Sequence, residues 1–568
     1  MTSRIRFQLG AADREIVAEV AADARRNAWA ERLFAREAGL WTDDLAVQRE
    51  IAGRLGWLDV PERFTLQIAA LEGFGDAIRE AGFSTAVVMG MGGSSLAPLV
   101  LHRIFGTTPG YLDLRVLDST DPSAVAATVD DLDPLQTLWI FASKSGTTTE
   151  PLAFLADARS RLEAALDAAD SDQRPGEFLV AITDPGRSLE SIPGQDDMRE
   201  RFLNPPDVGG RYSALTYVGL VPASLIGLDL DSLLASASGM LGQCREPDPD
   251  ANPGVGLGVA IGALAKAGRD KLTFLPDAAL APFGAWAEQL LAESTGKHGV
   301  GIVPVVGEPP RAAAEYASDR VFVELALSGG HADGERATLL RALARAGQPV
   351  IRIELDDPID LGGEFVRWEV ATAIAGAVLG IDPFDQPNVE DSKERTRRLL
   401  AGQAPGGEGA GGAETRPALR VAELGETGLT DGLRDGLAGL RPPAYVALQA
   451  FIAPSRATDA ALVGIRAALA ATGCATTAGY GPQFLHSTGQ LHKGGPATGT
   501  FIQLTSDHPV DRQIPGWPYS FGRLIDAQAR GDREALRAHD RPVIHVHLGS
   551  DLEADLRTLE RAVARALG

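Results

Sequence analysis

Short runs of apolar residues recur along this chain and alternate with longer segments in which apolar residues repeat at helical spacing. Strands buried on both faces of a parallel sheet are apolar throughout, whereas half-exposed strands alternate apolar and polar residues. Because the apolar runs alternate with helical segments, the pattern predicts an α/β protein built on parallel sheets. The expected strands lie at residues 85–89, 138–140, 178–183, 271–275, 321–327, 350–355, 445–452 and 542–548.

The first fifty or so residues carry a helical pattern without such runs. Apolar residues at helical spacing fill residues 11–40, and no glycine or proline interrupts them before Gly39. We expect a helical lead-in that packs on the first domain. Near the other end of the chain, helices are expected at residues 460–471 and 552–567.

Two segments poor in large apolar residues divide the chain. Residues 243–256 contain three prolines, and residues 401–417 (AGQAPGGEGAGGAETRP) are rich in glycine, so both are expected to be linkers. At 568 residues the chain exceeds the size of one hydrophobic core. The expected units are a helical lead-in at 1–55, α/β domains at 56–242 and 257–400, the glycine-rich linker at 401–417 and a third, C-terminal α/β unit at 418–568.

Composition excludes several classes of partner. The net charge of −23 argues against nucleic acid and anionic membranes. Two cysteines, Cys244 and Cys474, are too few for a disulfide framework or a metal cluster, so no metal is expected. No apolar run reaches the ~20 residues of a membrane span, and the N-terminus lacks the apolar core of a signal peptide. We therefore expect a cytoplasmic protein.

A loop of small hydroxyl residues, FASKSGTTTE at 141–150, follows the expected strand at 138–140 and precedes a helical segment. Side-chain hydroxyls, backbone N–H groups and the positive end of a helix dipole together suit an anion such as phosphate. Clusters of Ser, Thr and Gly after strands are also typical of plain turns and helix caps, so this loop by itself leaves both interpretations open. The residues expected to bind phosphate are Ser143, Lys144, Ser145, Thr147 and Thr148.

A second loop of the same design, GMGGSS at 90–95, follows the expected strand at 85–89. Its glycines lack a Cβ and let a ligand approach the backbone closely. The loop has neither the GxGxxG spacing of a dinucleotide site nor the GK[ST] ending of a P-loop. Two such loops in one α/β unit therefore indicate a phosphorylated ligand that is not a nucleotide, with Gly92, Gly93 and Ser94 as further binding residues.

Five motifs occur in the order and approximate spacing of the phosphoglucose isomerase family, which this chain resembles. Their shared order is far more specific than any one motif. The resemblance is closest to the isomerase portion of bacterial bifunctional transaldolase/glucose-6-phosphate isomerases, although the residues before the first motif are too few for a transaldolase barrel of ~250 residues. The motifs are MGMGGSSLAP (89–98), ASKSGTTTE (142–150), GGRYS (209–213), EQLLAESTGK (288–297) and FDQPNVEDSK (384–393).

The resemblance implies the reversible conversion of glucose 6-phosphate to fructose 6-phosphate, without a cofactor. It also implies that the domains at 56–242 and 257–400 are sugar-isomerase (SIS) domains with flavodoxin-like parallel sheets, and it allows a homodimer. An acidic protein that binds an anionic sugar must concentrate its cations at the site. The cations that lie inside motifs are Lys144, Arg211, Lys297 and Lys393.

Isomerisation of this kind needs a base that moves a proton between C2 and C1, a cation beside the enediolate oxygen, and a group that opens the sugar ring. The resemblance assigns the base to Glu293 and the cation to Arg211. A carboxylate is suitable because burial can bring its pKa toward neutrality, where it both accepts and returns a proton.

Three further polar residues follow from the motifs. Gln289 lies one helical turn before Glu293, so it is expected to share its face and to hydrogen-bond the substrate. The resemblance places Lys393 at the ring oxygen and Gln386 at the phosphate. The seven residues that separate Gln386 from Lys393 correspond to two helical turns, which predicts that both project from one helix face.

The ring-opening histidine departs from the family pattern. The family places it between the glutamate motif and the Gln…Lys motif, where this chain has only His298 and His331 without the expected context. The segment LHSTGQ at 485–490 resembles the histidine segment of the shorter bacterial isomerases. We therefore assign ring opening to His486, with His492 as the alternative.

Two other functions stay open at this point. A sugar-phosphate-binding regulator would keep the phosphate loops but do no chemistry, and an isomerase of an amino- or pentose phosphate would share the same loops. The presence of Glu293, Arg211, Gln386 and Lys393 together argues against the regulator.

Overall fold

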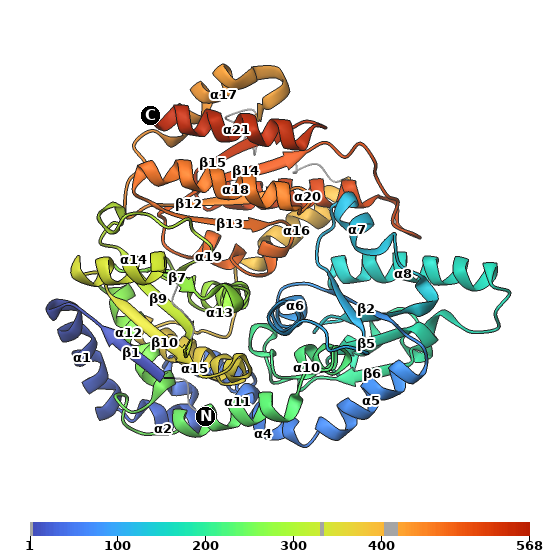
Figure 1. Cartoon of the computed structure of the whole chain (residues 1–568), viewed down its shortest axis with the longest axis horizontal. Coiled ribbons are helices and arrows are strands. Elements are labelled where there is room, and N and C mark those ends of the chain that lie inside the picture. Colours follow the sequence, from blue (N-terminus) through green and yellow to red (C-terminus); the bar gives the residue numbers. More distant parts are fainter. Residues whose placement is uncertain (1–3, 330–333, 403–417) are drawn as a thin grey trace.

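Three five-stranded sheets, each flanked by helices, surround a common centre in the computed structural model of the chain (Figure 1). The structure describes residues 4–329, 334–402 and 418–568. Parallel pairing dominates all three sheets, so the predicted α/β class is confirmed. The boundaries of the domains stay a prediction.

The first sheet has the strand order β3-β2-β4-β5-β6 and is parallel throughout. Since the chain moves outward from β2 to β3 and then returns past β2 to β4, the order reverses between β2 and β4. Ligands of open α/β sheets bind at such a point, beyond the carboxyl ends of the strands. The strands are β2 (Thr85–Gly90), β3 (Asp113–Leu117), β4 (Thr137–Ala142), β5 (Leu179–Thr183) and β6 (Glu200–Leu203), with helices α5 (Ile68–Glu80), α6 (Gly93–Phe105), α7 (Pro122–Val129), α8 (Thr149–Ala168), α9 (Arg187–Glu190) and α10 (Tyr217–Leu225).

The second sheet has the order β1-β10-β9-β7-β8, with β1 antiparallel and the other strands parallel. Helices α12 and α15 pack against each other beside it, and α13 leads from it toward the centre of the molecule (Figure 1). The elements are β1 (Arg4–Gln8), β7 (Lys271–Pro276), β8 (Val303–Val305), β9 (Arg320–Leu327), β10 (Val350–Leu355), α11 (Leu230–Cys244), α12 (Pro253–Lys266), α13 (Phe283–Thr295), α14 (Gly334–Arg345), α15 (Leu361–Leu379) and α16 (Val389–Leu400).

The N-terminal lead-in differs from the prediction. Its first described residues form β1, which adds to the edge strand β10 with Ile5 opposite Ile353 and Phe7 opposite Ile351. The alternation of polar and apolar residues in RIRFQ is typical of such an edge strand, but five residues give a weak signal. Helix α1 then packs on α12, so the prediction that the lead-in packs on the first domain is wrong for β1 and α1. The helices of this segment are α1 (Ala11–Arg26), α2 (Trp29–Phe34), α3 (Leu45–Ala52) and α4 (Val60–Thr65).

The third sheet has the order β11-β15-β14-β12-β13 and is parallel. Its amphipathic helices α17, α18 and α21 cover one face, while α19 and α20 turn toward the rest of the molecule (Figure 1). The elements are β11 (Leu419–Arg420), β12 (Tyr445–Phe451), β13 (Ala475–Tyr480), β14 (Gly499–Ser506), β15 (Val543–Leu548), α17 (Val421–Leu437), α18 (Arg456–Leu469), α19 (Gly489–Gly494), α20 (Phe521–Ala538) and α21 (Leu552–Leu567).

The two predicted linkers have different outcomes. Helix α11 continues to Cys244 and α12 begins at Pro253, so the linker predicted at 243–256 is limited to the residues between these helices. The Asn252 side chain caps α12 there by accepting hydrogen bonds from the backbone N–H groups of Gly254 and Val255. Residues 403–417 of the predicted glycine-rich linker lie outside the described residues.

The third unit shares hydrophobic cores with both other units. Phe521 of α20 stacks on Phe154 of α8 at a centroid distance of 6.0 Å and belongs to the largest core cluster. A second cluster joins Leu491 of α19 to Ala292 of α13. Burial of apolar surface on two sides fixes the third unit against the first two.

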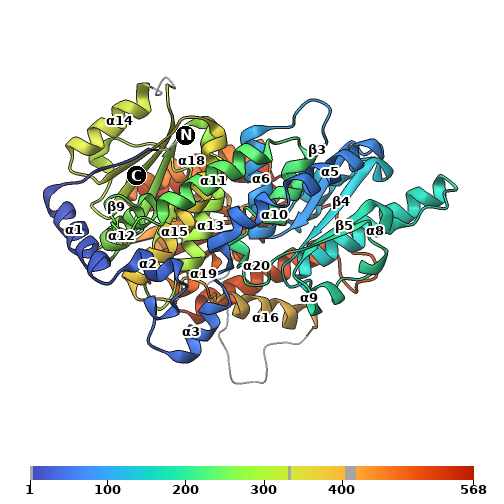
Figure 2. The same cartoon turned by 90° about the horizontal axis from the view of Figure 1, so that it is seen from below.

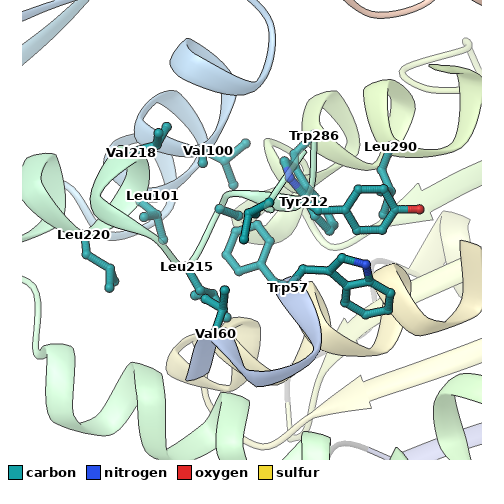
Figure 3. Close-up of a cluster of buried hydrophobic side chains, with 14 of the residues drawn as sticks. Trp57, Val60, Val100, Leu101, Tyr212, Leu215, Val218, Leu220, Trp286 and Leu290 are labelled. Atoms are coloured by element: carbon teal, nitrogen blue, oxygen red, sulfur yellow. The ribbon is translucent and has the colours of Figure 1, made fainter. Parts of the chain in front are cut away.

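Aromatic packing at the centre fixes the segment that carries Arg211. Figure 3 shows Trp57 beside Tyr212, with Trp286 of α13 and Val100 of α6 around them. The ring centroids of Trp57 and Tyr212 are 5.1 Å apart. Arg211 therefore starts from a buried and closely packed turn. In the described part of the chain, no helix is both long and apolar enough to cross a membrane.

Candidate active site

A pocket of about 810 Å³ opens where the three units meet. Its walls come from the loops after β2 and β4, from α13, from α16 and from the segment that precedes α19. Figure 2 shows β4, α13, α16 and α19 from below. Most of the residues that the sequence assigned to the site line the pocket, with Lys297 and the alternative His492 as exceptions. Those that line it are Gly92, Gly93, Ser94, Ser143, Lys144, Ser145, Thr147, Thr148, Arg211, Gln289, Glu293, Gln386, Lys393 and His486.

The hydroxyl loop after β4 forms one end of the pocket. Oγ of Ser143 lies 3.0 Å from Oγ1 of Thr148, and Oγ1 of Thr147 donates to Oγ of Ser145 at 3.0 Å. The loop leads into α8, whose first backbone N–H groups and positive dipole end face the same region. Lys144 adds a positive charge, and its Nζ is held by Oδ2 of Asp184 at 2.5 Å. This end therefore suits a phosphate group.

Neighbouring segments of the protein approach the loop after β2 so closely that two of its glycines leave no room for a side chain. A Cβ on Gly93 would lie 2.1 Å from the carbonyl oxygen of Gly210, and one on Gly92 would lie 2.5 Å from that of His486. Gly92 also has a positive φ of 54°. We expected these glycines to admit a ligand to the backbone. The structure adds a second reason, because they let the Arg211 turn and the His486 segment approach the loop.

Glu293 lies on the inner face of α13 between an arginine and a glutamine. Nη1 of Arg211 is 3.2 Å from its Oε1, and Nε2 of Gln289 donates to its Oε2 at 3.1 Å. Gln289 thus shares the face of Glu293, as the spacing predicts. Glu293 is only 8% exposed, so its carboxylate reaches solvent through the pocket alone.

The guanidinium of Arg211 is held in a fixed orientation. Its Nε donates to Ser294 and its Nη2 donates to the backbone carbonyls of Pro383 and Asp385. Nη1 donates to Oε1 of Gln386 at 2.8 Å and faces Glu293. Because both of these partners line the pocket, Nη1 is the part of the guanidinium that can meet a substrate oxygen.

Lys297 does not belong to the pocket, although its position in a motif made it a candidate cation. Its fully buried Nζ donates to the carbonyls of Asp382 and Asp385 and pairs with the carboxylate of Asp385. Burial, together with the nearby charge of Arg211, lowers the pKa of Lys297 to about 8. This lysine therefore supports the loop whose carbonyls hold Arg211.

Gln386 and Lys393 do not share a helix face, because α16 begins at Val389. Gln386 lies in the preceding loop, immediately before Pro387, and reaches Arg211 from there. Lys393 lies on the first turns of α16 and lines the pocket. The prediction of a common helix face is therefore wrong, but both side chains still reach the pocket.

His486 reaches the pocket from the third unit. It ends a short 3-10 turn, Gln483–His486, after β13. The carbonyl of His486 accepts a hydrogen bond from Nε2 of Gln289 at 2.7 Å, and its ring Nε2 lies 3.2 Å from Oε1 of Glu150. Gln483 of the same turn donates to Asp118 at the end of β3. The turn is thus tied to both other units.

Glu150 is a site residue that sequence reasoning missed, although it ends the quoted motif ASKSGTTTE. Burial alone would raise the pKa of its carboxyl, but the charge and hydrogen bond of His486, together with a backbone hydrogen bond and the charge of Lys393, lower the pKa below its ordinary value. Gln528 of α20, also missed, donates to the same Oε1 at 2.6 Å. Gln528 follows no motif, so no local signal in the sequence marks it.

The other candidate histidines that the structure describes lie outside the pocket. His492 is buried against Phe484 and Phe501, and burial lowers its pKa well below its ordinary value. His298 is exposed near the end of α13 and does not line the pocket. His331 lies outside the described residues.

Positive charge gathers at the pocket as expected for an anionic ligand. Lys144, Arg211 and Lys393 line it, and the structure adds Arg54 and Arg397. The carboxylates among the lining residues are Glu150, Asp184 and Glu293. Burial raises the pKa of Asp184, although the charge of Lys144 opposes this effect.

Comparisons with known proteins agree with this geometry. The family model described as phosphoglucose isomerase matches residues 59–305. A glucose-6-phosphate isomerase of Rubrobacter xylanophilus is 31% identical over 387 residues, which cover 60% of this chain and 88% of the relative. A glucose-6-phosphate isomerase of Symbiobacterium thermophilum is 30% identical over 409 residues, which cover 61% of this chain and 87% of that relative.

A solved structure shares the fold of this chain over most of its length. The crystal structure of a hypothetical protein from Thermus thermophilus superposes with a TM-score of 0.59 and 26% identity, and covers 70% of this chain and all of that protein. A relative that is 31% identical, matched over 88% of its length, shares more than a fold with this chain. Together with a pocket that unites all five motifs, this similarity shows that the chain belongs to the phosphoglucose isomerase family.

Proposed function

We propose that this chain interconverts glucose 6-phosphate and fructose 6-phosphate by proton transfer through an enediolate. One observation carries the proposal: the carboxylate of Glu293 and the guanidinium of Arg211 lie 3.2 Å apart in the pocket that also holds the two phosphate loops. A base beside a fixed cation is what proton abstraction next to a carbonyl requires.

The phosphate binds at the end formed by Ser143, Ser145 and Thr148, at the start of α8. Its charge meets Lys144 and the helix dipole there. Phosphate contacts are made equally in the ground state and the transition state, so they supply affinity and placement rather than rate. The sugar chain then extends from this end toward α13.

Ring opening comes first. The ring oxygen must gain a proton and the anomeric hydroxyl must lose one, which frees the carbonyl at C1. His486 carries out this exchange, with Lys393 beside the ring oxygen. The hydrogen bond between Nε2 of His486 and Glu150 supports this role, because it orients the ring and leaves Nδ1 for the substrate.

Proton transfer between carbons follows. Glu293 takes the proton from C2, the electrons move onto the carbonyl oxygen, and Arg211 stabilises the negative charge of the enediolate. The proton of the C2 hydroxyl passes to the oxygen on C1 within the enediolate, so that the negative charge moves to the oxygen on C2. Glu293 then returns its proton to C1, which leaves the carbonyl at C2 and a hydroxyl on C1. Since the guanidinium is fixed by Ser294 and by two backbone carbonyls, it need not reorganise as charge develops.

The proposal is tested with purified protein and glucose 6-phosphate in deuterated water. We expect fructose 6-phosphate to form and deuterium to enter C2 of the recovered glucose 6-phosphate. A non-catalytic sugar-phosphate-binding regulator would bind the sugar without incorporating deuterium. An isomerase of an amino- or pentose phosphate would show a higher kcat/KM with that sugar, and either result would overturn the proposal.

A homodimer and a cytoplasmic location stay predictions. Analytical ultracentrifugation of the whole chain would test the first, and cell fractionation would test the second.

A further inference from the structure

Four side chains from four segments of the chain form a continuous hydrogen-bonded row at the wall of the pocket, and all of them except Thr120 line the pocket. Oγ1 of Thr120 donates to Oε1 of Gln528 at 2.7 Å, and Nε2 of Gln528 donates to Oε1 of Glu150 at 2.6 Å. The same carboxylate oxygen faces Nε2 of His486 at 3.2 Å. Thr120 is fully buried and Gln528 is 3% exposed, so water does not replace these contacts freely.

The row fixes which way the Gln528 amide points. If the amide were turned over, its oxygen would face the Glu150 carboxylate, and two acceptors would meet without a proton between them. The Thr120 hydroxyl supports the observed orientation, because it donates to the amide oxygen. Gln528 therefore presents an N–H group to Glu150, and a hydrogen bond to a carboxylate favours its ionised form.

We infer that Gln528 is a positioning residue for ring opening: its amide holds the Glu150 carboxylate oriented so that Glu150 fixes the imidazole of His486. The inference rests on the proposed function, in which His486 opens the ring. It also gives the third unit a second contribution to the reaction, since Gln528 reaches the carboxylate from α20 while His486 comes from the turn after β13.

Two variants separate positioning from mere packing. Gln528→Leu removes the donor and fills similar space, so turnover of glucose 6-phosphate should fall on the order of 10-fold, as for a lost hydrogen bond to a charged group. Gln528→Glu is nearly isosteric, but its carboxyl can donate to Glu150 only when it is protonated.

The pH dependence of turnover distinguishes the two variants. The charged or titratable groups that act on Glu150 are His486, Lys393 and Tyr519, and all of them remain in both variants. Two neighbouring carboxyls share one proton as the pH falls. The turnover of Gln528→Glu relative to the parent protein should therefore rise as pH is lowered from 8 to 5.5, whereas that of Gln528→Leu should stay constant.

A matched control is Gln449→Leu. Gln449 is also a buried amide of the third unit that contacts a histidine, since its Nε2 lies 3.2 Å from Nδ1 of His492, but neither residue lines the pocket. The turnover of Gln449→Leu should equal that of the parent protein at every pH, even if the thermal stability of this variant is lower.

A second substrate distinguishes the inference from the proposed function. An aldohexose 6-phosphate without hydroxyls on C4 and C5 cannot close a five- or six-membered ring, so it needs no ring opening. C2 exchange of this compound should be unchanged in Gln528→Leu. If His486→Ala slows the turnover of glucose 6-phosphate while both Gln528 variants keep full turnover, the inference is overturned and the proposed function stands. If His486→Ala itself keeps full turnover, the proposed role of His486 fails.

Discussion

Nε2 of His486 lies 3.2 Å from Oε1 of Glu150, although 336 residues separate the two along the chain. Glu150 lies in the first turn of α8 in the first unit, and His486 belongs to the third unit. A carboxylate that accepts from Nε2 keeps the proton on that nitrogen and leaves Nδ1 to exchange a proton with the sugar. Under the proposed function, the third unit thus contributes the ring-opening group to a pocket that the first two units mostly build.

His486→Ala should therefore slow turnover of glucose 6-phosphate by about 10²-fold, because general acid–base assistance of ring opening is lost. Exchange of the C2 proton in a substrate that is already open-chain should persist, because Glu293 is intact. Both rates can be measured by NMR in deuterated water. Unchanged turnover of the cyclic sugar would remove His486 from the mechanism.

His492→Asn serves as the comparison. His492 packs between Phe484 and Phe501 and has no access to the pocket, so its replacement should lower thermal stability without a ring-opening defect. A selective ring-opening defect in this variant would transfer the assignment from His486 to His492.

Removing residues after 402 is a less informative experiment than the point variants. Phe521 and Leu524 belong to the core cluster of the first two units, and Leu491 packs with Ala292 of α13. A truncated chain would expose these apolar contacts and would fold poorly for reasons unrelated to catalysis.

Glu293→Gln keeps the size of the side chain and one acceptor oxygen, but it cannot accept a proton from C2. Turnover should fall by about 10²-fold or more, while sugar-phosphate affinity changes little. Deuterium incorporation at C2 should disappear together with turnover. Near-parental activity would show that another group is the base.

Most of the fold could be predicted from the sequence because the strands are buried and apolar. The strand predicted at 350–355 coincides with β10, and those at 271–275 and 321–327 differ from β7 and β9 by one residue. β1 escaped prediction because it is an edge strand of five residues in which every residue except Ile5 is exposed, so its apolar signal is short.

The sequence predicts a site residue wherever that residue lies inside a recognisable local motif. Arg211 and Glu293 were found because their neighbours GGRYS and AESTGK carry the resemblance. Gln528 could not be found, because its role depends on how α20 packs against Glu150. Lys297 was misjudged for a similar reason, since only the structure shows that its Nζ turns toward the carbonyls of Asp382 and Asp385.

The hydroxyls of the loop after β4 should control affinity more than rate. We expect Ser145→Ala and Thr148→Ala each to raise KM for both sugar phosphates about 5- to 10-fold with a smaller change in kcat, because their contacts are made in the ground state and the transition state alike. Steady-state kinetics in both directions measure this split.

Two controls accompany these variants. Thr148→Ser keeps the hydroxyl that lies 3.0 Å from Ser143 and should keep affinity. Ser171 lies half-buried in the segment after α8, outside the pocket, so Ser171→Ala should leave KM unchanged. Unchanged KM in both Ser145→Ala and Thr148→Ala would contradict the phosphate assignment.

Gly93→Ala should damage the site through the protein backbone. The new methyl group would lie 2.1 Å from the carbonyl oxygen of Gly210, so the turn that carries Arg211 would have to move. We expect kcat/KM to fall by about 10²-fold or more, since a displacement of about 1 Å at a fixed catalytic group has that effect. Gly73→Ala is the matched control, because no atom lies within 4 Å of its new methyl group. In the exposed part of α5 it should stabilise the protein by ~0.5–1 kcal/mol and leave activity unchanged.

The buried Lys297 should make the free energy of unfolding rise with pH in the alkaline range. Its pKa is lowered by burial from 10.5 to about 8, so between these values the unfolded chain binds a proton that the folded protein has released. Stability rises with pH wherever the unfolded state binds more protons, so the contribution of Lys297 should increase from pH 8 to 10.5 and be constant below pH 8. Lys297→Met removes this group, and denaturant unfolding of both proteins from pH 7 to 10 isolates its contribution as a difference. That difference should grow in favour of the parent protein as pH rises, whereas a flat difference would mean that Lys297 stays charged.

The Lys297→Met variant should also lose turnover, because the carbonyl of Asp385 that Lys297 holds is one of the acceptors that orient Arg211.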